Sequence, residues 1–205
     1  MENINITKKI IDSAKNTAKE TVKKAELPIS DSTKDFVSRI YNSTTEVIDN
    51  FLKTKAQEIR TRDLGSKLYR YENVIMYRAK GRNSYNLEQN LGFLKEFNVA
   101  PKFVKYFELG ENDFLTVLEL SDKKLIPYAE VANKIPEQVK QKFVNDVKEL
   151  YQKKNIVNKE LFANKDALMV TNDGKNIVYA DWSQIHFLNP ENKKNMAEFI
   201  KDWKI

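Results

Sequence analysis

Cysteine is absent from this chain of 205 residues, and several other residue types are scarce. Without cysteine there is no disulfide, no thiolate zinc site and no cysteine nucleophile. The single histidine, His186, excludes a multi-histidine metal centre, and a Ser-His-Asp triad would have to use that one imidazole. Because there are only five glycines, a glycine-rich phosphate loop is nearly excluded. No apolar run reaches the roughly 18 residues that a membrane-spanning helix needs.

The residues that are present suit one folded domain with an excess of basic charge. Hydrophobic residues make up 41% of the chain, which argues against wholesale disorder. The formal net charge of +6 is spread along the sequence without an arginine-rich stripe, so we expect no nucleic-acid partner. Residues 1–27 lack the apolar stretch of a secretory signal, and we expect a cytoplasmic location. The abundance of Asn, Lys and Ile suggests an AT-rich bacterial genome.

Helical periodicity dominates the first sixty residues. From Ile6 to Ala25 a thin stripe, mostly of alanine, faces away from a lysine-rich side and predicts a solvated helix on the body. The alternative is that residues 1–30 make peripheral contact with a membrane surface or a partner. From Phe36 to Ile59 larger apolar residues recur every three or four positions, which predicts one long amphipathic helix packed on the body. We therefore expect a helical extension over residues 1–60 and a main domain over residues 61–205.

Beyond Arg62 the pattern changes to short alternating segments that are typical of strands, interrupted by helical segments. The predicted strands are 68–71, 74–79, 103–108, 114–120, 156–157, 167–170 and 177–180. The predicted helices are 85–97, 136–151 and 191–203. Asn172-Asp173-Gly174 is a strong signal for a hairpin turn between the last two strands.

Several of these segments resemble motifs of the protein-kinase-like superfamily. The segment 74–81 (VIMYRAKG) is similar to the third strand of the family, and 117–120 (VLEL) to the strand that leads into the hinge. The segment 155–161 (NIVNKEL) resembles the catalytic-loop pattern G-I-V-H-R-D-L, and 167–175 (ALMVTNDGK) resembles N-I-L-V-T-x-D-G-K. Asp181-Trp182-Ser183-Gln184 falls where the family has its metal-binding D-F-G or I-D-W-S-Q.

The resemblance is greatest with small atypical members: RIO-type, choline-kinase-like and lipopolysaccharide-core kinases. It implies an α+β, minimal bilobal kinase-like fold over residues 61–205. A small antiparallel sheet plus one helix would be followed by a reduced helical C-lobe, because few residues follow Asp181. The implied ligands are ATP and Mg²⁺, together with a hydroxyl acceptor that the sequence does not identify.

The resemblance also implies a set of nucleotide-binding residues. Arg78 or Lys80 would contact the phosphates; both face the same side of a strand because they are two positions apart. Glu88 on the following helix would pair with that basic residue. Glu119 and Leu120 would lie beside the adenine.

The catalytic and metal-binding residues depend on how the catalytic loop is aligned. In the preferred alignment Asn158-Lys159-Glu160 replaces His-Arg-Asp, so Glu160 orients the acceptor hydroxyl, and Asp166 falls near the position of the metal-binding Asn. Asp166 and Asp181 would then hold Mg²⁺, which prefers oxygen ligands. In the other alignment Asn164-Lys165-Asp166 occupies the H-x-D pattern, and Asp166 is the catalytic carboxylate.

Two departures from the family pattern leave three functions open. The glycine-rich loop is reduced to Leu64-Gly65-Ser66, and the catalytic-loop aspartate is replaced by Glu160 in the preferred alignment. The first function is an ATP-dependent phosphotransferase that acts on a protein, a sugar or a small molecule. The second is a pseudokinase scaffold that binds a protein partner. The third is an α+β adaptor that binds a protein or a membrane surface through its N-terminal helices.

Overall fold

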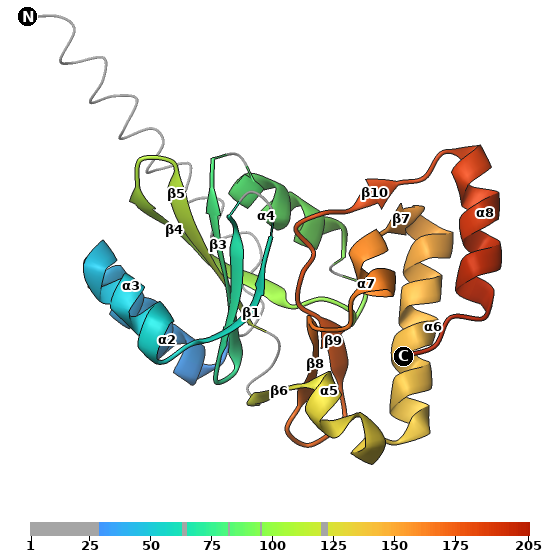
Figure 1. Cartoon of the computed structure of the whole chain (residues 1–205), viewed down its shortest axis with the longest axis horizontal. Coiled ribbons are helices and arrows are strands. Elements are labelled where there is room, and N and C mark those ends of the chain that lie inside the picture. Colours follow the sequence, from blue (N-terminus) through green and yellow to red (C-terminus); the bar gives the residue numbers. More distant parts are fainter. Residues whose placement is uncertain (1–28, 63–64, 82, 95, 120–122) are drawn as a thin grey trace, which may run out of the picture.

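The computed structural model describes residues 29–62, 65–81, 83–94, 96–119 and 123–205, and its fold is α+β. A five-stranded antiparallel sheet forms the first half, and helices with two small sheets form the second half (Figure 1). One apolar core contains side chains from both halves, among them Tyr77 and Trp182. Residues far apart in the sequence therefore meet where the halves join.

The sheet of the first half has the strand order β1-β2-β3-β5-β4. Its strands are β1 (Gln57–Thr61), β2 (Lys67–Tyr71), β3 (Val74–Lys80), β4 (Lys102–Gly110) and β5 (Asp113–Glu119). Tight turns join β2 to β3 and β4 to β5, and they place Glu72 and Asn112 at φ angles of 51° and 58°. Asparagine tolerates this left-handed region better than most residues do.

Alternation along the strands gives the sheet two apolar faces. The outer face packs against α2 (Asp31–Tyr41) and α3 (Thr45–Thr54), whose Phe36, Ile40, Ile48 and Leu52 are buried on it. The inner face packs against α4 (Asn83–Phe93) and the second half of the chain. The sheet thus lies between the two N-terminal helices and the rest of the molecule (Figure 1).

The prediction of one helix from Phe36 to Ile59 is wrong, because α2 ends at Tyr41 and a second helix, α3, begins at Thr45. Thr44 caps α3 by accepting a hydrogen bond from the backbone N–H of Val47, and such caps begin a new helix. Ile59 belongs to β1. The apolar residues of both helices nevertheless pack on the body, as their periodicity predicted.

The second half is built around α6 (Glu137–Lys154) and the hairpin of β8 (Leu168–Thr171) and β9 (Ile177–Tyr179). β6 (Leu125–Pro127) pairs with β8, and β7 (Ile156–Val157) pairs with β10 (His186–Phe187). The remaining elements are α5 (Tyr128–Val131), a 3-10 turn (Ala132–Lys134), α7 (Lys159–Ala163) and α8 (Pro190–Lys201).

The strands and helices predicted between residues 68 and 203 are confirmed, with ends shifted by a few residues. The elements that the sequence did not reveal are short: β1, β6, α5, α7 and β10. Because β1 begins at Gln57, the sheet starts before the predicted boundary at residue 60. The helix predicted from Ile6 to Ala25 lies outside the described residues. No helix of the described part is both long and apolar enough to cross a membrane.

Candidate functional site

Arg78 and Lys80, the predicted phosphate-binding residues, lie on the outer side of the sheet. Arg78 donates from Nε and Nη2 to the carboxylate of Asp113 over 3.1 and 2.6 Å, and from Nη1 to Asp49 of α3. The hydrogen bond with Asp113, which has the largest effect, and the one with Asp49 raise the pKa of Arg78, whereas burial opposes this rise. Lys80 is exposed at the end of β3. The residues of β3 that face the opposite side, namely Ile75, Tyr77 and Ala79, are buried in the core between the two halves. The positive charges of β3 therefore point away from the second half.

Glu88 is exposed on α4, while Asn90 on the same helix is buried against the second half. The Asn90 amide donates to the backbone carbonyls of Trp182 and Ser183 over 2.8 and 3.2 Å. Helix α4 thus contacts the segment 181–184 through an amide. Since Arg78 binds Asp49 and Asp113, the predicted pairing of Glu88 with Arg78 is not formed.

Glu119 is buried at the end of β5, where it anchors the start of α2. Its carboxylate accepts from the backbone N–H of Ser30 over 3.0 Å and from the Thr33 hydroxyl over 2.8 Å. The Ser30 hydroxyl donates to the same carboxylate. The Glu119 side chain therefore binds the N-terminal end of α2. Leu120, the other predicted adenine contact, lies outside the described residues.

Glu160 and Asp181 lie close together, and both carboxylates are bound by arginines from the edge of the sheet. Arg60 of β1 donates from Nη2 to Glu160 over 2.5 Å, and its Nη1 lies 3.7 Å from Asp181. Arg62, just after β1, donates from Nε to Asp181 over 2.7 Å. Asp181 is only 1% exposed. These four residues form a charge-balanced group, which we call the arginine–carboxylate cluster.

Neighbouring residues fix the two carboxylates in place. The Ser183 hydroxyl donates to Oδ1 of Asp181 over 2.7 Å. Asn158 caps α7 by accepting from the backbone N–H of Glu160 over 3.0 Å, and its amide donates to the Asp181 carbonyl over 2.7 Å. One buried amide thereby couples the helix that carries Glu160 to the segment that carries Asp181.

Asp166, which was predicted to be catalytic or to hold a metal, lies in an exposed turn before β8. Its backbone N–H donates to the Asn164 side chain over 2.8 Å, which closes the turn locally. The structure thus links Glu160 to Asp181 through Arg60, whereas Asp166 directly precedes Ala167, which accepts a backbone hydrogen bond from Ala180, and its side chain is exposed. The catalytic roles of Glu160 and Asp166 stay predictions.

A magnesium ion does not fit the carboxylates as they are arranged. Mg²⁺ requires oxygen ligands in near-octahedral geometry, usually including one or two free carboxylates. Asp181 is already occupied by Arg62 and Ser183, and Glu160 by Arg60. No group of three or more potential metal-ligating side chains is found in the described part of the chain. An added cation would also lie against two guanidinium groups.

Three polar atoms of this region are buried without a hydrogen-bond partner among the described residues: Nη1 of Arg60, Nη2 of Arg62 and the hydroxyl of Tyr179. Burial, followed by the charge of Asp181, raises the pKa of Tyr179, while the two arginines oppose this rise. The sequence pattern did not reveal either arginine, because the helical periodicity of the preceding segment runs on to Ile59, which belongs to β1. The signal that could have revealed them is the segment Ile59-Arg60-Thr61-Arg62, in which two basic residues occupy alternate positions.

Acid is expected to weaken the arginine–carboxylate cluster. The hydrogen bond from Arg60 lowers the pKa of Glu160 below its ordinary value of 4.5, although burial opposes this shift. A lowered folded-state pKa stabilises the protein above the unfolded-state value, and the stabilisation is lost as pH falls through the folded-state pKa. Urea unfolding of the wild type and Glu160→Gln should therefore differ most near neutral pH and converge below pH 4.5. A difference that stays constant with pH would contradict this assignment.

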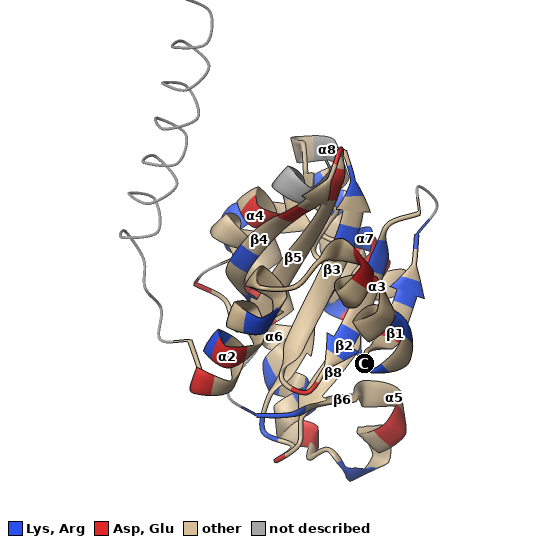
Figure 2. Cartoon of the chain, turned by 90° about the vertical axis from the view of Figure 1, so that its left-hand side faces the viewer, with Lys and Arg blue, Asp and Glu red and all other residues tan. Residues whose placement is uncertain are grey.

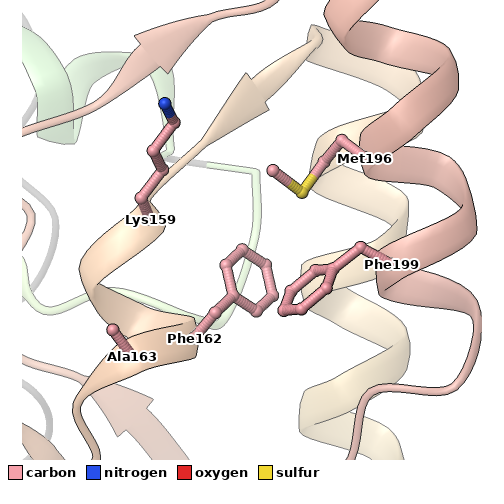
Figure 3. Close-up of a pocket in the computed structure, with 5 residues that line it drawn as sticks. All are labelled: Lys159, Phe162, Ala163, Met196 and Phe199. Atoms are coloured by element: carbon pink, nitrogen blue, oxygen red, sulfur yellow. The ribbon is translucent and has the colours of Figure 1, made fainter.

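An apolar pocket of about 270 Å³ lies between α7 and α8. It is lined by Lys159, Phe162, Ala163, Met196 and Phe199 (Figure 3). The rings of Phe162 and Phe199 meet edge to face, with centroids 5.3 Å apart. This lining can contact an apolar group, but it contains no carboxylate that could act as an acid or a base.

Comparison with known proteins gives a weak structural similarity and no similarity in sequence. No family model matches the sequence, and no curated protein is similar to it in sequence. Among solved structures the chain is similar to the kinase PK-1 of Cydia pomonella granulovirus, with 12% sequence identity and a TM-score of 0.43. The match covers 71% of this chain and 58% of the viral protein, so this chain spans less than two thirds of that protein's length.

Proposed function

We propose that this protein is a kinase-like scaffold without phosphoryl-transfer activity that acts by binding a protein partner. One observation carries the proposal: Asp181 is buried in contact with Arg62 and Ser183, and Arg60 links it to Glu160. Phosphoryl transfer requires carboxylates that hold Mg²⁺ beside the phosphates. Here the protein's own cations occupy Asp181, one of the two predicted metal ligands, and Glu160, the predicted catalytic carboxylate.

The other positions that resemble kinase motifs support the same proposal. Arg78 is held on the outer face by Asp49 and Asp113, and Lys80 lies on that side as well. An ATP-dependent phosphotransferase would need both arginines to leave the cluster and a different basic residue to reach the phosphates. Neither ATP nor Mg²⁺ is therefore part of the function that the geometry supports best.

The adaptor hypothesis is less well supported for the two N-terminal helices that the structure describes. The main apolar residues of α2 and α3, namely Phe36, Ile40, Ile48 and Leu52, are buried on the sheet, whereas Tyr41 of α2 and Val47 of α3 are 74% and 56% exposed. On that side of the molecule basic and acidic residues are interspersed (Figure 2). Exposed apolar groups also occur in other elements: Phe93 of α4 and Phe187 of β10 are 48% and 61% exposed. Their rings meet edge to face with centroids 5.3 Å apart, so they form one exposed apolar pair, and contiguous exposed apolar groups mark interaction surfaces more than single ones do.

Purified protein is expected to transfer no phosphate from γ-labelled ATP to itself or to generic hydroxyl acceptors in the presence of Mg²⁺. The reason is that Asp181, a predicted metal ligand, and Glu160, the predicted catalytic carboxylate, are already ion-paired. A phosphate-transfer assay should therefore give the same background for the wild type and for Asp181→Ala. Metal-dependent transfer by the wild type that Asp181→Ala abolishes would refute the proposal.

A further inference from the structure

We infer that Arg60 and Arg62 act as a built-in replacement for a divalent cation, which holds the edge of the sheet against Glu160 and Asp181. This inference rests on the proposed function, because it explains what occupies the carboxylates in place of a metal. The role of the two guanidinium groups is to hold β1 in a fixed position against the two carboxylates.

The contacts show that the arginines bridge the carboxylates much as a metal ion would. A single guanidinium, that of Arg60, reaches Glu160 through Nη2 and lies 3.7 Å from Asp181 through Nη1. Arg62 supplies the second positive charge at 2.7 Å from Asp181. Two carboxylates that share one guanidinium are close enough to share a hydrated divalent ion, which also brings two positive charges.

The cluster joins three separate parts of the chain. Arg60 and Arg62 come from the edge strand β1 and the residue that follows it, Glu160 from α7, and Asp181 from the segment after β9. Among the described strands β1 is an edge strand that pairs with β2, and its Arg60 contacts the second half of the chain. The arginines therefore connect the free edge of the sheet to the second half of the chain.

Buried polar atoms of the cluster that make no hydrogen bond to a described residue support a positioning role over a purely stabilising one. Nη1 of Arg60, Nη2 of Arg62 and the Tyr179 hydroxyl lack hydrogen-bond partners among the described residues. Buried ion pairs that leave polar atoms unsatisfied often add little stability compared with apolar residues, but removing one side of the pair is costly. What such a cluster can provide is a fixed position for β1 over Asp181.

The inference predicts a latent cation site beneath the arginines. If both arginines are made neutral, two adjacent carboxylates remain without a counter-charge. Mn²⁺ and Mg²⁺ suit carboxylate and water ligands, so either ion should then bind where the guanidinium groups were.

The test compares the melting temperatures of three full-length proteins with and without Mn²⁺. The wild type should not respond. Arg60→Gln/Arg62→Gln should melt at a lower temperature than the wild type, and about 10 mM Mn²⁺ should raise its melting temperature by about 5–10 °C if the dissociation constant is about 0.1 mM. The matched control adds Glu160→Gln and Asp181→Asn to these changes. It should fold and should not respond to Mn²⁺.

Each other outcome overturns the inference. A response of the wild type would mean that the arginines do not exclude a cation. A double variant that Mn²⁺ neither stabilises nor refolds would mean that the carboxylates cannot take a metal. A quadruple variant that does not fold would mean that the arginines do more than balance two charges. Phosphate transfer by the wild type would refute the proposed function, whereas the inference would still be decided by these melting temperatures.

Discussion

Arg62→Met is expected to lower the free energy of unfolding by about 3–5 kcal/mol at neutral pH, because it leaves the carboxylate of Asp181 buried without its closest cation. The Arg62 side chain is 11% exposed and lies 2.7 Å from Asp181. Methionine keeps much of the side-chain volume, so the loss reports mainly on the charge. Urea unfolding followed by circular dichroism measures the effect.

Two further variants show whether the loss comes from the unpaired carboxylate. Arg62→Met/Asp181→Asn removes both charges while keeping an oxygen that can accept the hydrogen bond from Ser183, so it should recover much of the stability. Lys67→Met removes a lysine from an exposed pair with Glu58 and should have a far smaller effect than Arg62→Met. If Arg62→Met is no more destabilising than Lys67→Met, Asp181 does not depend on Arg62.

Trp182→Ala is expected to cost about 3–5 kcal/mol of stability, since a large aromatic side chain would be deleted from a closely packed core. Trp182 is 0% exposed and packs edge to face against Tyr179, with ring centroids 5.9 Å apart. Its indole N–H donates to the Val99 carbonyl over 3.3 Å, and the same carbonyl accepts from the backbone N–H of Tyr179 over 2.9 Å. The loss should again appear in urea unfolding.

The second tryptophan provides a matched control for this substitution. Trp203 is only partly buried, in an aromatic group with Phe143 and Phe162, so Trp203→Ala should destabilise the protein less than Trp182→Ala. Trp182→Phe keeps an aromatic ring but loses the hydrogen bond to Val99, so it should fall between the wild type and Trp182→Ala. Equal losses for Trp182→Ala and Trp203→Ala would mean that Trp182 has no special part in joining the two halves.

The substitutions at Arg62 and at Trp182 test two different contacts of the segment 181–184, the ion pair of Asp181 and the packing of Trp182. Trp182 fixes the segment to the core, and Asp181 beside it faces the arginines. Asn90 of α4 holds the backbone of this segment through two carbonyls. The segment after β9 is therefore held firmly in the fold whether or not it takes part in any chemistry.

The sequence by itself determined the main elements from residue 68 onward, because their signals are local. Apolar residues at helical spacing predicted α6, and the turn Asn172-Asp173-Gly174 predicted the β8–β9 hairpin. It also determined that Arg78 and Lys80 share one side of a strand. The packing of residues 36–52 on the body followed likewise from their periodicity.

Only the tertiary structure decided which side of the sheet each residue faces and which charges meet. Alternation fixes that Arg78 and Lys80 face the same side, but the position of α2 and α3 decides that this is the outer side. The sequence predicted that Asp181 binds a metal and gave no sign of its partners, because Arg60 and Arg62 lie about 120 residues earlier in the chain. The pairing of such distant charges depends on how the sheet edge packs against α7 and the β8–β9 hairpin, and local periodicity carries no information about that packing.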